Sequence, residues 1–413
     1  MRSRRVLMIA FHVPPYRDSS GMLRTLKFSQ YLLEHEWMPV ILAPHTRAYA
    51  ALGSEFPKNY PNQIEVHRAF ALDTARHLAV NGTYLGWLAL PDRWNSWLLG
   101  AIPAGLSLIR KYRPEIIWST YPVPTAHLIG WALNRITGIP WIADFRDPMV
   151  YESWPTQPAQ RKVHSWVERM VVRNCRHAVF TTPGALRLYR ERYPQLPETR
   201  WKLIPNGYDE ADFPYANAKA SLPKGPVFLL HSGLMEIPDR DPSAFFWAVA
   251  ELRARNEISS ANLRVVLRAS GEEENFKRKI KDCEIGDIVS LEPRIAYADA
   301  LSEMMSADGL LLFQGPDCNR QIPAKAYEYL ALGKPVLGLV DPEGDTSALL
   351  REAGVTTLAS MTSRQEIAQI LRHFLSGIRS GNVKRPNLAA IAQYSRRSRA
   401  AELARLFDSV VGT

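Results

Sequence analysis

The stretch QIPAKAYEYLALGKPVLGLVD, residues 321–341, has the pattern of a helix that feeds a strand. Pro323 is suited to open the helix and Gly333 to close it, because proline is tolerated in a first helical turn and glycine commonly ends helices. An apolar strand follows at 336–340. Lys325 and Glu328 are three residues apart, so they share one face of the helix. That face is either a solvated surface ion pair or the wall of a binding site.

Apolar runs alternate with helical patterns on both sides of this stretch. The runs are VLMIAF (6–11), PVILAP (39–44), EIIWST (115–120), PWIADF (140–145), HAVFTT (177–182), VFLLHSG (227–233), LRVVLRASG (263–271), IVSLEP (288–293), GLLLFQG (309–315) and VTTLAS (355–360). This alternation is the βαβ rhythm of a parallel sheet covered by helices. The sequence therefore predicts the α/β class, with two Rossmann-like, doubly wound domains.

The rhythm pauses over residues 201–226, where the stretch 215–226 is polar and marked by Pro and Gly, which is typical of an interdomain connection. We therefore place an N-terminal domain at 1–205 and a C-terminal domain at 206–386. A last helix is expected at about 388–407, in a segment (387–413) that can pack on either domain or cross back to the first. Two such domains face each other across a cleft at the carboxyl ends of their strands, so the loops after strands are the positions to inspect.

The charge and cysteine content narrow the class of protein. Among 413 residues, 51 Lys and Arg oppose 41 Asp and Glu, and the net charge of +10 fits nucleic acid, anionic lipid or phosphorylated small molecules as partners. Three scattered cysteines without metal-ligand spacing favour a reducing compartment. The basic N-terminus and its short apolar run, which stops at His12, indicate a first strand and not a signal peptide. We expect a cytoplasmic protein, with room for peripheral contact at the inner face of a membrane.

Two loops that follow predicted strands offer anion-binding chemistry. Gly21 directly precedes a helix, whose free backbone N–H groups form an anion site, although an ordinary helix entry gives the same pattern. Ser232 and Gly233 let a backbone approach a ligand closely. Arg240, just before the next helix, is placed to clamp a diphosphate, unless it only pairs with a neighbouring aspartate. The chain has neither G-x-G-x-x-G nor a Walker motif, which argues against a dinucleotide dehydrogenase and a P-loop NTPase.

The opening helix follows such a strand too, so its N-terminus is expected at the same edge. The helix dipole favours an anion there by ~0.3–1 kcal/mol, and Lys325 adds a full positive charge. Glu328 is placed to accept two hydrogen bonds from a vicinal diol such as a ribose. The turn at 341–345, with Asp345, and the loop that carries Arg294 follow two other strands and complete the expected ligand contacts.

Taken together, these motifs resemble those of glycosyltransferases with the GT-B fold, in the large retaining group often called family four. They occur in the family's order over almost the whole chain. They are the P-P…G loop before residue 21, ADFRDP (143–148), IPNGYDEADF (204–213), HSG…RDP (231–242) and K-x-x-E-Y-x-x-x-G-K-P (325–335). PDRWNSW (91–97) is similar to an acceptor-domain segment of members that build surface polysaccharides.

The resemblance implies roles for individual residues. Glu328 matches the glutamate that binds the nucleotide ribose, and Arg240 matches a basic residue that stabilises the leaving diphosphate. Gly21 matches the loop glycine near the phosphates and the acceptor, and Asp144 or Asp147 lies where the family places a polar side chain beside the transferred sugar. The implied reaction transfers a sugar from a nucleoside-diphosphate sugar, UDP being the more frequent, to a saccharide or lipid-linked saccharide with retention of configuration.

The sequence departs from the family pattern at Arg320, which occupies the position of a first glutamate that contacts the donor sugar in many relatives. Lys325 lies inside the glutamate helix, where we expect it to supplement Arg240. These two cations and the helix N-termini are suited to stabilise the leaving group without a metal, so we expect no metal and no cofactor beyond the nucleotide-sugar substrate.

Other interpretations stay open at this point. A nucleotide-sugar epimerase has the same architecture, and a sugar-nucleotide-binding module without catalysis would fit Arg320. Nucleic-acid binding is disfavoured, because the basic residues are dispersed and no recognition motif occurs. The segment 83–113 has three tryptophans and a basic end, which suits a membrane interface, unless the tryptophans belong to the core.

Overall fold

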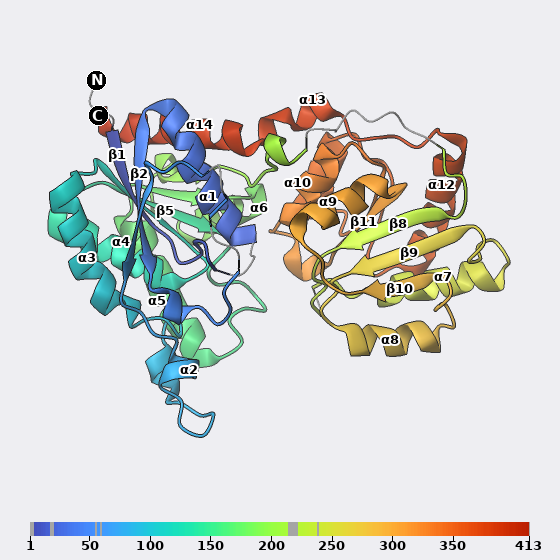
Figure 1. The fold of residues 1–413 in the computed structure, drawn as a ribbon, viewed down its shortest axis with the longest axis horizontal. Coiled ribbons are helices and arrows are strands. Elements are labelled where there is room, and N and C mark those ends of the chain that lie inside the picture. The colour runs from blue at the N-terminus through green and yellow to red at the C-terminus, as the bar shows by residue number, and fades with distance from the viewer. Residues whose placement is uncertain are drawn as a thin grey trace. The chain divides into compact units, whose positions relative to one another are not determined.

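The structure is a computed structural model that describes residues 4–16, 20–53, 56–57, 60–213, 222–237 and 239–412, without the side chain of Ser20. By internal contacts the chain forms two units (Figure 1). Unit 1 comprises Met1–Asn206 with Arg396–Thr413, and unit 2 comprises Gly207–Ser395. Part of the predicted connection at 215–226 lies outside the described residues. No helix in the described ranges is long and apolar enough to cross a membrane.

Unit 1 is built on a seven-stranded sheet in the order β3-β2-β1-β4-β5-β6-β7, whose strand pairings are parallel. The strands are β1 (Arg4–Ile9), β2 (Trp37–Pro44), β3 (Glu65–Ala69), β4 (Ile116–Thr120), β5 (Trp141–Arg146), β6 (His177–Phe180) and β7 (Trp201–Leu203). The helices are α1 (Ser20–Leu32), α2 (Thr74–His77), α3 (Trp97–Tyr112), α4 (Pro124–Thr137), α5 (Pro158–Asn174), α6 (Pro183–Arg192) and α14 (Arg396–Val411).

Unit 2 has a six-stranded parallel sheet in the order β10-β9-β8-β11-β12-β13. Its strands are β8 (Val227–Ser232), β9 (Leu263–Arg268), β10 (Val289–Glu292), β11 (Gly309–Gln314), β12 (Val336–Val340) and β13 (Leu358–Ala359). Its helices are α7 (Ser243–Ala254), α8 (Glu273–Asp282), α9 (Tyr297–Ser306), α10 (Ala324–Ala331), α11 (Asp345–Glu352), α12 (Arg364–Ser380) and α13 (Leu388–Ile391).

Short 3₁₀ turns connect several of these elements. They are η1 (Leu33–His35), η2 (Thr46–Ala48), η3 (Gly86–Ala89), η4 (Glu198–Arg200), η5 (Glu210–Asp212), η6 (Pro316–Cys318) and η7 (Ala392–Tyr394). The predicted class, with two parallel-sheet α/β domains, is confirmed. The central strands β4, β5, β11 and β12 are buried along their whole length, because helices cover both faces of each sheet, and this explains their continuous apolar runs.

The single last helix predicted at 388–407 is wrong. The structure instead has α13, η7 and then α14, with a break at Ser395, whose backbone is extended. At the break the chain pairs with Tyr208, whose N–H donates to the carbonyl of Tyr394 at 3.2 Å. Pairing with a distant segment thus overrides local helical propensity. Beyond the break, α14 packs on α1 within unit 1, and Trp37 donates to Asp408 at 2.9 Å.

Candidate functional site

In unit 2, the helix α10 presents Lys325 to the end of strand β8. The Lys325 Nζ lies 3.1 Å from Nε2 of His231, and Nδ1 of His231 lies 2.9 Å from the carbonyl oxygen of Leu311. Nε2 also lies 3.1 Å from the carbonyl oxygen of Gly233, so the imidazole stands between two carbonyl acceptors and the ammonium; when it is neutral and donates from Nδ1 to Leu311, Nε2 accepts from Lys325. Burial and the charge of Lys325 hold the pKa of His231 well below its usual value, which agrees with a neutral imidazole. His231 therefore positions Lys325 without neutralising it.

The loop after β8 leaves room for this lysine. Gly233 has a φ of +120°, which side chains other than glycine rarely adopt, and a Cβ atom there would lie 2.8 Å from Nζ of Lys325. The N–H of Ser232 donates to the hydroxyl of Tyr329 at 2.9 Å, which ties the loop to α10. The predicted close approach of a ligand to the backbone at Ser232 and Gly233 stays a prediction, and the group that lies nearest to Gly233 in this structure is Nζ of Lys325.

If the nucleotide-sugar donor that the sequence predicts binds beside Lys325, Gly233→Ala weakens its binding by about tenfold, because the added methyl displaces Lys325 and the backbone is strained by about 1–3 kcal/mol. Titration calorimetry with a UDP-sugar measures the first effect and thermal unfolding the second. Gly225→Ala is the matched control, since a Cβ at Gly225 meets nothing within 4 Å. Equal affinities of the two variants would contradict the role of Gly233.

Arg240 is the second cation of this cluster. Its Nε donates to Oε1 of Gln314 at 2.9 Å, and Gln314 is a buried residue at the end of β11. Burial, together with the charge of Arg240, lowers the pKa of Lys325 to about 7. A lysine whose proton affinity is lowered by a neighbouring cation marks a site that gains from binding a dianion. We refer to the cations Lys325 and Arg240, together with the neutral His231 that contacts Lys325, as the cationic cluster.

Asp241, which follows Arg240, has partners of its own. The side chain of Asp241 accepts from the N–H of Ser243 at 3.0 Å, at the start of α7, and from Nζ of Lys279 at 3.2 Å. Asp239 and Asp241 have a spacing at which two carboxylates can share a metal ion, yet Asp241 is engaged by the start of α7 and by Lys279. Within the described ranges, no three His, Cys, Asp or Glu side chains form a group that could hold a metal. Metal independence stays a prediction.

Glu328 lies one turn after Lys325 on α10. Its Oε1 is 3.4 Å from the hydroxyl of Tyr297, which begins α9 and also lies 3.3 Å from a carboxylate oxygen of Asp212. Tyr297 is a large, exposed aromatic residue that our sequence reasoning missed. The feature of the sequence that could have identified Tyr297 is its position at the start of α9, directly after the loop in which Arg294 was predicted as a site residue. Arg294 is exposed in that loop, three residues before Tyr297.

Asp345 and Arg320 lie near the start of helix α11. Asp345 is buried, and its N–H donates to the carbonyl of Asn319 at 2.9 Å. Arg320 follows Asn319 in the chain, and its side chain is exposed. The structure therefore places Ser232, Gly233, Arg240, Lys325 and Glu328 around one edge of the sheet of unit 2, with Asp345 at the neighbouring helix start.

In unit 1, Gly21 lies in the first turn of α1 beside a buried cation. A Cβ at Gly21 would lie 2.7 Å from Nη1 of Arg146 and 3.0 Å from Nδ1 of His12. Arg146 is buried, with a left-handed φ of 60°, and Nη1 donates to the carbonyl of Tyr121 at 3.2 Å. Burial and the nearby Arg146 lower the pKa of His12 to about 3, so its imidazole is neutral. Arg146 belongs to the ADFRDP motif but is not among the site residues predicted from the sequence.

The two aspartates of that motif differ in their surroundings. Asp144 is fully buried, and Arg24 donates to both of its carboxylate oxygens at 2.9 Å, while Thr120 donates at 3.0 Å. Arg24 also donates to the carbonyls of residues 204 and 205, so the pair fixes α1 to the IPNG segment. These contacts give Asp144 a structural function. Asp147 is half-buried next to Arg146.

Comparisons with known proteins agree with this architecture. The family described as "Glycosyl transferase 4-like domain" matches residues 23–207. No curated protein sequence matches the chain. Solved structures that resemble it include a sucrose-phosphate synthase from Thermosynechococcus elongatus, with a TM-score of 0.68 and 16% identity over 99% of both chains.

Two further similar structures contain ligands. The Anabaena protein HepE in complex with UDP has a TM-score of 0.65 and 12% identity, covering 98% of this chain and 100% of that one. An alpha,alpha-trehalose-phosphate synthase (UDP-forming) from Burkholderia xenovorans in complex with glucose-6-phosphate has a TM-score of 0.64 and 12% identity over 99% and 100%. At these identities the likeness shows the fold. With the domain match, it confirms the prediction of a GT-B glycosyltransferase.

Proposed function

Because the chain is a GT-B glycosyltransferase with a glycosyl transferase 4-like domain, we propose that it moves a sugar from a nucleoside-diphosphate sugar to a saccharide or lipid-linked saccharide, as in polysaccharide biosynthesis. The cationic cluster of unit 2 is the observation that carries this proposal. UDP is the favoured nucleotide, since one similar structure contains UDP and the name of another describes it as UDP-forming. We further propose that the protein is cytoplasmic and works at a membrane surface.

In this proposal the donor diphosphate binds between Lys325 and Arg240, at the N-terminus of α10. Glu328 accepts hydrogen bonds from the ribose hydroxyls, and the exposed ring of Tyr297 next to it offers a face on which the base stacks. In unit 1, Arg146 and the first turn of α1 at Gly21 offer a second anion site. Asp147, and not the ion-paired Asp144, takes the proposed contact with the transferred sugar.

The reaction breaks the bond between the anomeric carbon and the diphosphate, and negative charge grows on the leaving oxygen. Arg240 and Lys325 are already in place to stabilise that charge, so no reorganisation is needed when it develops. The proposed retention requires the acceptor hydroxyl to attack from the side of the leaving group and to give its proton to the departing phosphate oxygen. The two cations supply the charge stabilisation, so the proposal needs no metal.

Donor affinity is expected to fall as the pH rises above about 7, by up to about tenfold per pH unit. The pKa of Lys325 in the free protein is about 7, so the side chain is charged below this pH and neutral above it, and a diphosphate binds the charged form. The diphosphate of a UDP-sugar keeps its charge across the range from pH 6 to 9, so a change in its attraction to Lys325 over this range reports on the protein.

Lys325→Arg is the control, because an arginine stays charged over the whole range and should flatten the profile. An affinity of the unmodified protein that is constant from pH 6 to 9 would show that the charge of Lys325 plays no part in binding the donor.

The function itself is tested by incubating the full chain with UDP-sugars and saccharide acceptors and determining the anomeric configuration of the product by NMR. The proposal expects a new glycosidic bond with the anomeric configuration of the donor. An epimerised nucleotide sugar would support the epimerase alternative. Binding without donor hydrolysis or transfer would support the non-catalytic module that Arg320 left open.

A further inference from the structure

Unit 1 carries an apolar projection between α2 and α3, formed by residues 78–89, which we call the apolar arm. In Figure 1 the chain after α2 extends away from the sheet of unit 1. Val80 is 73% and Trp87 67% exposed, and the other large exposed side chains of the arm are those of Leu78, Tyr84 and Leu85. Five such side chains within ten residues form a patch, and patches of this kind mark interaction sites.

The arm has a defined conformation. Val80 and Thr83 exchange two backbone hydrogen bonds, at 2.8 and 3.1 Å, around Asn81 and Gly82, which have φ angles of 50° and 75°. Two positive φ angles at the centre of a two-residue loop are the geometry of a tight hairpin turn, which Asn-Gly favours. The 3₁₀ turn η3 then satisfies further backbone groups. The arm therefore presents apolar side chains with many of its backbone groups already paired.

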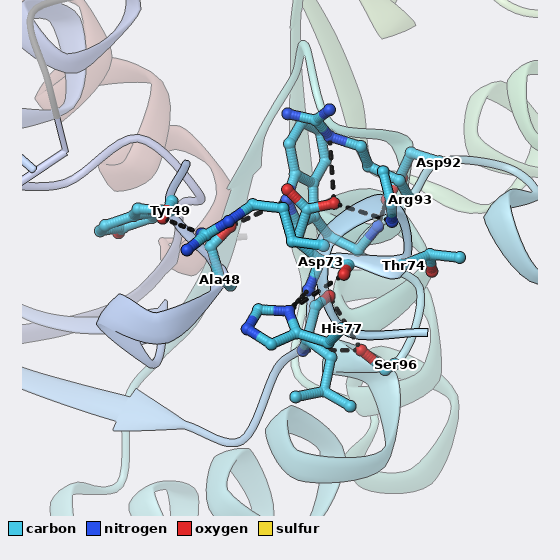
Figure 2. Close-up of polar contacts among 12 residues, drawn as sticks. Ala48, Tyr49, Asp73, Thr74, His77, Asp92, Arg93 and Ser96 are labelled. Carbon is cyan, nitrogen blue, oxygen red and sulfur yellow. Dashed lines mark hydrogen bonds and ion pairs between the residues drawn. The ribbon is translucent and has the colours of Figure 1, made fainter. Parts of the chain in front are cut away.

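A polar network fixes the base of the arm (Figure 2). The fully buried Asp73 accepts from the N–H of Ala75 at 3.1 Å, and Nε of Arg93 lies 3.5 Å from the same carboxylate. Thr74 bridges the two sides of the base: its N–H donates to the carbonyl of Arg93 at 2.8 Å and its hydroxyl to that of Leu88 at 3.1 Å. The arm is thus held at both ends, and its apolar exposure is a built feature of the fold.

The exposed charges of the chain segment that carries the arm have one sign. From residue 66 to residue 114 the sequence contains two carboxylates, Asp73 and Asp92, and both are buried. The cations at the base are exposed, namely Arg47 and Arg76, or partly exposed, namely Arg93. Exposed Trp, Tyr and Leu side chains next to basic groups are the composition of a surface that binds the interface of an anionic bilayer.

We propose that the apolar arm docks unit 1 on a bilayer that contains anionic lipid. Val80, Leu85 and Trp87 enter the boundary between headgroups and acyl chains, while the exposed Arg47 and Arg76 at the base face the lipid phosphates. The segment 83–113, predicted to suit a membrane interface, contains three tryptophans in different environments. Trp87 is exposed, Trp94 packs on the core and Trp97 is buried. The inference deepens the proposed function and rests on it in one respect: a lipid-linked acceptor would lie at such a surface.

Co-sedimentation of the full chain with vesicles tests the docking. We expect binding to phosphatidylcholine vesicles that contain phosphatidylglycerol, weaker binding without the anionic lipid, and a loss of about tenfold or more in the double variant Leu85→Asp/Trp87→Asp. Trp247→Asp is the matched control, since Trp247 is an exposed tryptophan of unit 2. Binding to neither vesicle, or an equal loss in the control, would overturn the proposal.

A probe on the arm keeps the test independent of folding defects. The three native cysteines, at positions 175, 283 and 318, are buried, so a polarity-sensitive fluorophore can be attached selectively to Val80→Cys. We expect its emission to shift to the blue with anionic vesicles, and an unshifted emission would contradict insertion. Glu328→Ala should retain vesicle binding and the arm variants should retain UDP binding, so failure of the docking and failure of the donor site are separate results.

Discussion

Arg240→Ala is expected to lower kcat by about 10²–10³-fold with the fold intact. Loss of one preorganised group that stabilises charge in a transition state typically has this effect. Arg240 is held by Gln314 at 2.9 Å and lies near Lys325, so the cluster would keep one cation and lose the other. Steady-state kinetics with a radiolabelled UDP-sugar measure the change, and circular dichroism checks the fold.

Arg255→Ala is the matched control, because Arg255 is an exposed residue of the same unit that pairs with Glu251. Its kcat should equal that of the unmodified protein. A kcat for Arg240→Ala within a factor of about three of the unmodified value would remove this residue from the mechanism.

Arg24→Met is expected to destabilise the protein by about 3–5 kcal/mol, because it leaves the carboxylate of Asp144 buried without its partner. The same substitution removes the hydrogen bonds to the carbonyls of residues 204 and 205. Denaturant unfolding of the full chain, followed by fluorescence, measures the loss. The double variant Arg24→Met/Asp144→Leu should recover part of it, since no unpaired charge then remains.

The variant Asp144→Asn distinguishes a catalytic role of Asp144 from a structural one. If Asp144→Asn lowers donor turnover at unchanged stability, Asp144 contacts the reacting sugar and our structural interpretation is wrong. If Asp144→Asn lowers the free energy of unfolding while the folded protein keeps its kcat, Asp144 serves to stabilise the fold through its ion pair with Arg24.

Much of the fold follows from the sequence because buried parallel strands read as continuous apolar runs. The strand at 336–340 and the helix before it were predicted from local signals alone, namely a proline, a glycine and an apolar run. The last helix was mispredicted because its break at Ser395 depends on pairing with Tyr208, which lies far away in the chain. No local pattern carries that information.

In the candidate site too, features that depend on neighbouring residues could be predicted from the sequence, and contacts between distant residues could not. Lys325 and Glu328 share a helix face, and spacing alone predicted this. The contact between Lys325 and His231 joins residues 94 positions apart, and that between Arg24 and Asp144 joins residues 120 positions apart. Such pairs arise from the order of the strands in the sheets. The sequence therefore proposed Asp144 for catalysis, and only its partners indicate a structural function.

Calorimetric titration of the full chain with UDP, compared with the Lys325→Ala variant, tests the central claim most directly. We predict saturable binding by the unmodified protein and an affinity lower by about 10- to 100-fold in Lys325→Ala, as expected for the loss of hydrogen bonds to a charged ligand. Lys277→Ala, at an exposed lysine of α8, should bind as the unmodified protein does. No saturable binding, or equal affinities in both lysine variants, would contradict a nucleotide site at the N-terminus of α10.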